Sequence, residues 1–547
     1  MISLSLFLVI VATSTSFIIW RLTRSLISSS PLDNVPGPKS LSYSKGNIEK
    51  LFDRTGWDFL DDLGTKYNKV VRLTGLFGHR MLYVFDPTAL QYIVLKDAGA
   101  YEIPEWAQAI NHLTVGPSIL GVRGETHRKQ RKILNPVFSV KHMRSLAPIF
   151  YAIAHKLCTS IDAQVGHRAI ELDIMAWLSR VSLELIGQGG LGCSLDTLEK
   201  PTPNVFGDAL KDMTAAIFAF AELQFFSKHV KKLGPAWFRD TLANMIPISK
   251  ITRLRNTIRT IETESVKILR AKKTALQAGE AKVTEQVGEG KDIMSVLLKA
   301  NMNASVDEGL SDAELLAQMG TLAAAATDTT SNALTKMMEI LAHDSGIQER
   351  LRAEITEAQR QYGKYIPHDE LVALPYMDAF CRETLRLYPP VPQIMREAQN
   401  DTIMPLSKPM VGVDGATIQE IIVPAGTTIV IAIRSWNLDK DVWGDNALEF
   451  KPERWMNPLP STVTESRIPG VYSNLMTFHG GGRSCVGFKF SQLEIKVLLS
   501  VLLPKFRISP AGNTKDVVWN LSGIQYPTLG RESNKPAFPI TMERISI

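Results

Sequence analysis

Hydrophobic and polar positions along the chain predict helices over most of its length. The segment "SDAELLAQMGTLAAAATDTTSNALTKMMEIL" has a helical pattern and opens with a capping box formed by Ser311 and Glu314. A second helix, "PYMDAFCRETLRLYP", ends at Pro389, where the chain cannot continue helically. β-Branched residues and turn signals favour short strands in Val70–Asp86 and Val411–Ile433. We therefore expect a mainly α fold with a minor β part.

An uncharged apolar segment, Ile2–Trp20, opens the chain and is followed by Arg21 and Arg24. Its 19 residues are close to the roughly 20 that a membrane-spanning helix needs. A cleaved signal peptide is the alternative, but no basic side chain precedes the run, which is longer than a usual signal core. The sequence predicts a single-pass transmembrane anchor in residues 1–20, a basic flank and proline-rich linker in residues 21–40, and one large cytosolic domain in residues 41–547.

Composition narrows the function classes. With 45% hydrophobic and 21% charged residues, the chain has the composition of an ordinary folded protein. Its four cysteines are widely spaced and form no CxxC pair, which argues against a disulfide scaffold or a zinc ribbon. The net charge of +6 is spread along the chain without basic runs interleaved with aromatic residues, so we expect no nucleic-acid partner.

One cysteine stands in an unusual setting, the stretch "FHGGGRSCVG". A lone cysteine is usually a buried thiol that packs as a small hydrophobe. Here three glycines allow strained turns and a close approach to a flat ligand, and Arg483 offers a fork that suits a carboxylate. Cys485 also precedes an apolar helix, whose N-terminus favours a thiolate. These are the conditions that an axial thiolate ligand of haem iron needs.

The same stretch resembles the F-x-x-G-x-R-x-C-x-G signature of the cytochrome P-450 monooxygenases, with Phe478, Gly481, Arg483, Cys485 and Gly487 at the fixed positions. Further elements in the family's order extend the resemblance over roughly residues 36 to 540. The resemblance implies a single haem domain of that fold and a haem b cofactor with Cys485 as the axial iron ligand. The chain resembles fungal microsomal members of the family, and this resemblance implies a location in the endoplasmic reticulum membrane.

A candidate oxygen-activating motif lies within the long predicted helix. The sequence "AATDTT" resembles the family's A-G-x-D/E-T-T, and this places Asp328 and Thr329 in the acid and alcohol positions. The alternative is that the hydroxyls bond back to helix carbonyls. The resemblance implies that both residues help to deliver protons in a dry pocket. Ala326 stands where the family usually has glycine, so an added methyl group narrows the space beside the oxygen site.

The sequence "ETLR" places Glu383 and Arg386 on one helix face, where a surface ion pair is the ordinary interpretation. In the family this ExxR pair joins an arginine of a later motif, here Arg454 in "FKPERW". The resemblance implies a structural role for all three residues.

The resemblance also places Arg131, Arg396 and Arg483 near the haem propionates, a contact for which guanidinium groups are well suited. Arg131 belongs to "HRKQR", which is similar to the family's W-x-x-x-R with His127 in the tryptophan position. His127 shares a helix face with Arg131 and can donate to a propionate, although its charge then depends on pH.

By resemblance, the chain is expected to insert one oxygen atom of O2 into a small lipophilic substrate. No flavin or nicotinamide domain is recognised, so we expect electrons from a separate NADPH-dependent reductase. Arg128, Lys129 and Lys132 are candidate docking charges for it, unless they are merely solvated. A haem-thiolate isomerase or dehydratase and a non-enzymatic haem-binding protein remain alternatives.

The substrate is the least determined feature. Met319, Leu322, Ala323 and Ala326 predict an apolar wall, and Gln393 is the one polar residue in the candidate segment Val391–Ile394. We therefore expect a compact neutral hydrocarbon such as a terpenoid, with fatty-acid or aromatic hydroxylation as alternatives. The segments Ala215–Phe226 and Trp237–Ile248 are expected either to form an apolar lid that rests on the membrane or to pack in the core.

Overall fold

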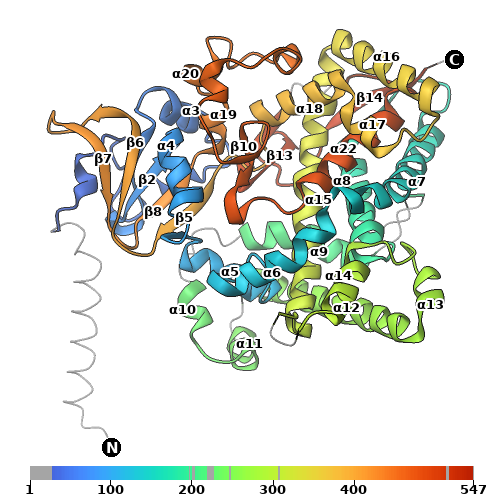
Figure 1. Ribbon diagram of the computed structural model, residues 1–547, viewed down its shortest axis with the longest axis horizontal. Coiled ribbons are helices and arrows are strands. Elements are labelled where there is room, and N and C mark those ends of the chain that lie inside the picture. Colours follow the sequence, from blue (N-terminus) through green and yellow to red (C-terminus); the bar gives the residue numbers. More distant parts are fainter. Residues whose placement is uncertain are drawn as a thin grey trace, which may run out of the picture.

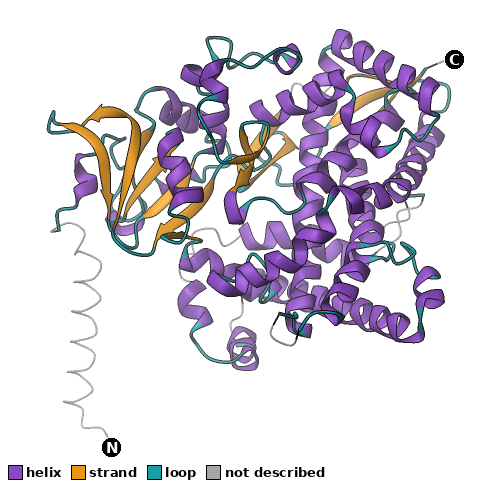
Figure 2. Ribbon diagram, in the orientation of Figure 1, coloured by secondary structure: helices purple, strands orange, loops and turns teal. Residues whose placement is uncertain are grey.

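A strand-rich part and a larger helix-rich part lie side by side, as Figure 1 and Figure 2 show. This computed structural model describes residues 28–195, 198–199, 204–218, 227–245, 248–305, 308–512 and 516–545. Helices predominate in number and length, so the expected mainly α fold with a minor β part is confirmed.

The largest sheet has five strands in the order β1-β2-β8-β5-β3. Its strands are β1 (Val70–Thr74), β2 (Arg80–Val84), β8 (Thr428–Ile431), β5 (Ile394–Ala398) and β3 (Tyr101–Glu102). All four residues of β8 are buried, as its near-continuous β-branched sequence favours for a central strand. β8 runs parallel to β2 and antiparallel to β5, and β5 pairs in turn with β3. This register carries two site residues, Arg396 on β5 and Glu102 on β3, to one edge of the sheet.

Four smaller sheets complete the β structure. They are the hairpin β6 (Thr402–Val411) with β7 (Thr417–Val423), the pair β9 (Gly470–Tyr472) with β10 (Leu475–Gly480), the hairpin β12 (Val517–Ser522) with β13 (Ile524–Leu529), and a sheet of β11 (Phe506–Pro510), β14 (Pro539–Arg544) and β4 (Ile170–Asp173).

The helices form most of the second part. They include α5 (Glu105–Val115), α6 (Gly124–Leu134), α7 (Val140–Val165), α8 (Ile174–Leu185), α9 (Val205–Phe218), α10 (Ser227–Lys231), α11 (Ala236–Asn244), α12 (Ser249–Ala278), α14 (Ile293–Met302), α15 (Asp312–His343), α16 (Ser345–Tyr362), α18 (Pro375–Leu387) and α22 (Phe488–Leu502).

The long helix α15 crosses the helical part and packs against α8, α9, α12 and α22 (Figure 1). Its predicted capping box is present: the Ser311 hydroxyl accepts from the Glu314 N–H, and the Glu314 carboxylate accepts from the Ser311 N–H. Most of its middle is buried, including Leu315, Met319 and Leu334. Because it is long and anchored on several sides, α15 presents its side chains from a rigid support.

The predicted membrane anchor, Ile2–Trp20, lies outside the described residues. Within the part of the chain that is described, no helix has both the length and the apolar character that a membrane crossing requires.

Candidate functional site

The site is built around the loop that joins β10 to α22. Gly480 and Gly481 are required here by close packing. A Cβ on Gly480 would lie 1.9 Å from the Pro469 carbonyl oxygen, and one on Gly481 would lie 2.3 Å from the Val94 oxygen. Gly481 also has a φ of +61°, which other residues rarely adopt. The Cys485 N–H then donates to the Phe478 carbonyl at 2.9 Å and closes the loop.

Cys485 lies just before α22, whose N-cap residue is Gly487, as the sequence predicts. Its side chain is exposed, although the preceding Ser484 is buried. Protein still surrounds the thiol closely enough for burial to raise its pKa, while the Gly487 N–H and Arg131 lower it. Cys485 is therefore open to a ligand although protein surrounds much of its side chain.

Phe478 supports the start of this loop. Its ring packs edge-on against Tyr472, with centroids 5.4 Å apart, and lies 6.0 Å from the Phe488 ring at an angle of 51°. These contacts join the strand before the loop to the helix after it. Phe478 and Gly487 therefore flank Cys485 as the signature predicts, with Phe478 held by aromatic packing.

Each predicted propionate-binding arginine is held by a different protein group. Arg131 on α6 donates to the Ser484 carbonyl and, at 3.0 Å, to the Ser484 hydroxyl. Arg483 pairs with the Glu102 carboxylate at 2.7 Å and donates to two loop carbonyls. Arg396 on β5 lies with its Nη2 2.6 Å from Nε2 of His479. Burial, with a smaller effect of Arg483, lowers the pKa of Arg396 to about 10.

His127 links these arginines into one cluster. It is buried, with 6% of its surface exposed, and burial lowers its pKa to about 4. That pKa includes smaller contributions from Arg483, Arg131 and Arg396, which lower it, and from Glu102, which raises it. All three arginines are thus close enough to act on one imidazole, and His127 is neutral at neutral pH in this environment.

The charge of the cluster suits haem. Burial would raise the pKa of Glu102, but Arg483 and nearby backbone N–H groups lower it overall, so the carboxyl is ionised. Three arginines against one carboxylate leave an excess of two positive charges, and haem carries two propionates. Together with an accessible thiol, this donor set fits an iron porphyrin with a thiolate ligand.

The predicted oxygen-side residues lie on α15. Ala325 is exposed, whereas Ala323 and Thr327 on either side of it are buried, and the Thr329 hydroxyl donates to the Ala325 carbonyl at 2.7 Å. Thr330 lies 3.3 Å from the Ser491 hydroxyl of α22, so this turn of α15 is tied to the helix that follows Cys485. Asp328 is partly buried, and its carbonyl accepts a 2.7 Å bond from Asn332.

The predicted apolar wall of α15 differs from the observed one. Met319 and Ala323 are fully buried because neighbouring helices cover them, and Leu322 is 7% exposed. The accessible surface here comes from Ala325, with Ala326 partly exposed. Of the four predicted wall residues only Ala326 is accessible, and Ala325, which was not predicted, is the most open residue beside it.

Glu383, Arg386 and Arg454 form a buried network rather than a surface pair. Arg386 makes two bonds to the Glu383 carboxylate at 2.8 and 2.9 Å, and Arg454 approaches it at 3.4 Å. Trp455 and the Lys451 N–H also donate to Glu383. Burial would raise the pKa of Glu383, but Arg386 and these donors lower it overall. Removing one member of such a pair typically costs about 3–5 kcal/mol.

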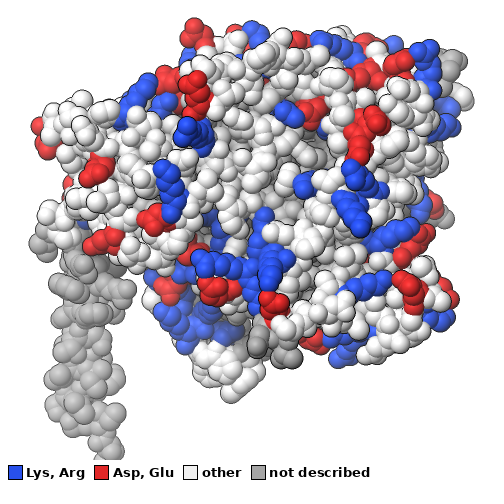
Figure 3. Space-filling view, viewed as in Figure 1, with Lys and Arg blue, Asp and Glu red and all other residues white. Residues whose placement is uncertain are grey.

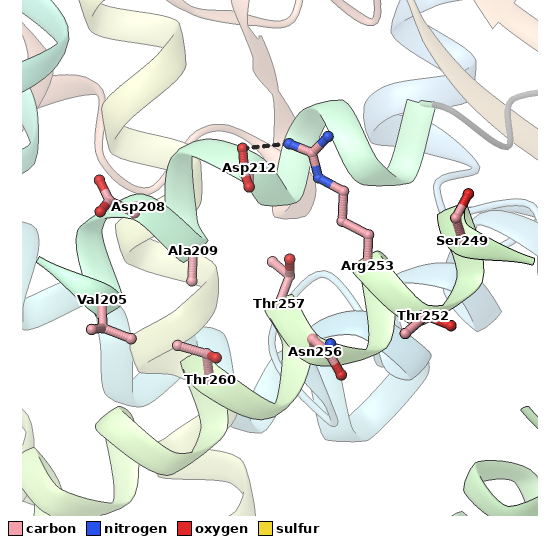
Figure 4. A pocket seen from close by; sticks show the side chains of 10 residues that line it. All are labelled: Val205, Asp208, Ala209, Asp212, Ser249, Thr252, Arg253, Asn256, Thr257 and Thr260. Atoms are coloured by element: carbon pink, nitrogen blue, oxygen red, sulfur yellow. Dashed lines mark hydrogen bonds and ion pairs between the residues drawn. The ribbon is translucent and has the colours of Figure 1, made fainter. Parts of the chain in front are cut away.

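A separate cavity of about 700 Å³ lies between α9 and α12 (Figure 4). Asp208 and Asp212 face it from α9, and Arg253 of α12 reaches across to Asp212 at 2.8 Å. Neither Cys485 nor any of the predicted cofactor-binding and proton-delivering residues lines this cavity. It is therefore distinct from the surroundings of Cys485.

Two residues of the cluster, His479 and Glu102, were not predicted from the sequence. His479 lies inside the quoted glycine-rich stretch, at a position that the signature leaves variable. Glu102 carries no local signal, because its partner Arg483 is 381 residues away along the chain. Pairing between β3 and β5 is what brings Glu102 to the cluster.

Comparison with known proteins gives consistent matches. A family model for cytochrome P450 matches residues 36–528. Cytochrome P450 monooxygenase 91 of Postia placenta is 46% identical over 531 residues, which is 96% of this chain and 97% of that protein. Ganoderic acid synthetase of Ganoderma lucidum is 43% identical over 548 residues, 99% of each chain. A cytochrome P450 monooxygenase of Hericium erinaceus is 33% identical over 523 residues, 94% of each chain.

Proposed function

The chain belongs to the cytochrome P450 family, and from this premise we propose a haem-thiolate monooxygenase that inserts one oxygen atom of O2 into a small lipophilic substrate. The observation that carries the proposal is Cys485, an accessible thiol at the start of α22 beside a cluster with two excess positive charges. Electrons come from a separate NADPH-dependent reductase.

The cofactor is haem b, which supplies an iron centre at which dioxygen is reduced. Cys485 binds the iron, and Arg131, Arg396, Arg483 and His127 hold the propionates. The conformation of Gly481 keeps the loop close to the neighbouring backbone, which supports a flat ligand. Burial disfavours a charged thiol, so the Gly487 N–H and Arg131 are the groups that favour the thiolate before iron binds.

Proton delivery is assigned to Thr329 and Asp328. Ala325 and Thr329 are one helical turn apart and share a face of α15, and Ala325 leaves that face accessible. The Thr329 hydroxyl donates to the Ala325 carbonyl, so its oxygen lone pairs remain able to accept a hydrogen bond from ordered water. Asp328 is the carboxylate that supplies protons to this path.

The substrate is proposed to be a neutral terpenoid or a similar secondary-metabolite intermediate. Two features support it: the small apolar side chains of Ala325 and Ala326, and similarity over 99% of the chain to a relative named as a ganoderic acid synthetase. Hydroxylation of a fatty acid or an aromatic compound by the same site is the second candidate. The apolar surface of α15 disfavours charged or strongly polar substrates.

A location at the endoplasmic reticulum membrane, with the large domain in the cytosol, is part of the proposal. Trp237 and Met245, on and just after α11, are 70% and 74% exposed. Lys and Arg side chains of α6 and α10 gather nearby in the face drawn in Figure 3. Exposed apolar residues beside cations suit an anionic lipid surface.

The test compares the purified chain with Cys485→Ala. The unsubstituted protein should bind haem, give the thiolate-type carbon monoxide spectrum, and consume NADPH and O2 with a reductase and a terpenoid panel. Cys485→Ala should lose that spectrum and all turnover. Turnover without reductase would point to an isomerase or dehydratase, and haem binding without any turnover to a non-enzymatic protein. Hydroxylation by Cys485→Ala would overturn the proposal.

A further inference from the structure

His479 is a strained and buried residue beside the proposed cofactor site. It lies between Phe478 and Gly480 with a φ of +56°, a region that few residues other than glycine occupy. Only 7% of its surface is exposed. Such strain costs free energy and persists only where the surrounding structure holds it, and it is found most often at functional sites.

The contact with Arg396 fixes the tautomer of His479. Nη2 of Arg396 lies 2.6 Å from Nε2 of His479, and a guanidinium can only donate. Nε2 must therefore accept, which places the ring proton on Nδ1. Burial, followed by the charge of Arg396, holds the pKa of His479 well below its ordinary value, so the ring is neutral. His479 thus has one N–H donor left, at Nδ1.

That remaining donor is buried without an acceptor. Nδ1 of His479 has no hydrogen-bond partner among the residues that the structure describes. A buried donor left unpaired typically costs about 1–3 kcal/mol. The same ring already contacts Arg396, and the cluster around it has two more positive charges than negative ones. An anion bound by Arg396 is the acceptor that this arrangement lacks.

We propose that Nδ1–H of His479 donates a hydrogen bond to the haem propionate that Arg396 binds, which makes His479 a cofactor-binding residue of this chain. One ring would then act on the propionate twice, by direct donation and by accepting from Arg396 so that the guanidinium keeps its orientation. The inference rests on the proposed haem binding, and it concerns a position that the family signature leaves variable.

Two substitutions separate the two nitrogens. In His479→Gln the side-chain oxygen can take the place of Nε2 and accept from Arg396, but no donor remains at Nδ1. In His479→Asn the amide nitrogen can take the place of Nδ1, but no acceptor remains for Arg396. Neither substitution adds a charge to the buried cluster. Each holoenzyme is compared with the unsubstituted one by the rate of haem transfer to apomyoglobin and by the reduction potential of the iron.

The expected result is that His479→Gln loses haem about tenfold faster or more, because a hydrogen bond to a charged group is removed. Its reduction potential should fall, since an unscreened propionate charge favours ferric iron. His479→Asn should lie closer to the unsubstituted protein in both measurements. A normal His479→Gln with an impaired His479→Asn would show that the ring acts only through Arg396, and two unchanged variants would remove His479 from cofactor binding altogether.

If neither variant folds, a structure of the unsubstituted holoenzyme tests whether His479 contacts the propionate. Nδ1 should lie within hydrogen-bonding distance, at most about 3.5 Å, of a propionate oxygen. A longer separation would overturn the inference while leaving the proposed function intact. A chain that binds no haem at all would instead contradict the proposed function itself.

Discussion

At the scale of single residues, the four cysteines differ in accessibility. Burial raises the pKa of Cys193 and Cys381 to about 12 and that of Cys158 to about 11. Cys158 and Cys381 are buried and Cys193 is partly so, whereas Cys485 is exposed. Burial acts on Cys485 as well, but a backbone N–H and Arg131 oppose it. Local backbone around Cys485, rather than the thiol itself, therefore makes it the candidate ligand.

Thr329→Ala should leave haem binding unchanged and divert oxygen to peroxide, because the variant lacks the hydroxyl proposed to relay protons. We expect NADPH consumption to continue while product per NADPH falls about a hundredfold, the lower end of the range that positioned proton-transfer groups contribute. Thr327→Ala is the matched control. The Thr327 hydroxyl makes a similar bond, to the Ala323 carbonyl at 2.8 Å, but Thr327 is 2% exposed. Unchanged coupling in Thr329→Ala would remove Thr329 from the mechanism.

Glu494 on α22 predicts how stability depends on pH. It is fully buried, accepts from Ser182 at 2.5 Å, and its Oε2 has no partner among the described residues. Burial raises its pKa to about 8, against 4.5 for an ordinary glutamate. Between these two values the folded chain keeps a proton that the unfolded chain has lost, so stability falls as pH rises.

Glu494→Gln should remove that slope. By pH 8 the buried carboxyl costs up to about 4 kcal/mol of unfolding free energy, and the neutral amide avoids this cost. Thermal unfolding of the holoenzyme between pH 5 and pH 8 should show a flatter profile for Glu494→Gln. Glu280→Gln, at a side chain 87% exposed, serves as the control and should follow the unsubstituted profile. Parallel profiles for all three proteins would mean that Glu494 does not carry this proton.

At the scale of elements, local patterns predict what local contacts determine. The capping box and the apolar spacing predict both ends of α15 to within a few residues. The prolines that follow α18 predict where α18 ends. The order of the five-stranded sheet cannot be obtained in this way, since β8 lies between β2 and β5 through contacts distant in sequence. The same limit applies to the site: Cys485 and Arg483 belong to a local motif, whereas Glu102 reaches Arg483 only through that sheet.

The helices α10 and α11 provide a test of membrane contact. A protein that begins at Ser28, without the predicted anchor, should still bind vesicles of phosphatidylcholine and phosphatidylserine. Trp237→Ser with Phe238→Ser should weaken this binding at least about tenfold, because each ring contributes on the order of 1.5–3 kcal/mol when buried. These side chains are 70% and 39% exposed.

The control for this experiment is Leu448→Ser, at a side chain 57% exposed and distant in sequence from both helices. It should leave vesicle binding unchanged. Equal loss in the control would indicate non-specific adhesion, and no loss in the double variant would mean that α11 does not touch the lipid.

At the scale of the whole molecule, charge and the position of the site bear on how electrons reach it. Arg131 ties α6 to Ser484, next to Cys485, so the exposed side of α6 borders the thiolate loop. Arg128 and Lys132 are 73% and 72% exposed there, and each is paired with a carboxylate, Glu125 and Glu308. Exposed pairs of this kind add little stability, so their cations remain available to an acidic partner.

Reversing both charges, with Arg128→Glu and Lys132→Glu, should slow the first electron transfer from an NADPH-dependent reductase. Electrostatic steering speeds association at low ionic strength, so we expect a decrease of about tenfold there that shrinks as salt is added. Stopped-flow reduction under carbon monoxide measures this rate. Lys267→Glu on α12, at a side chain 66% exposed and also paired with a glutamate, is the matched control and should behave normally. A decrease that salt does not diminish, or an equal decrease in the control, would place the reductase on another face.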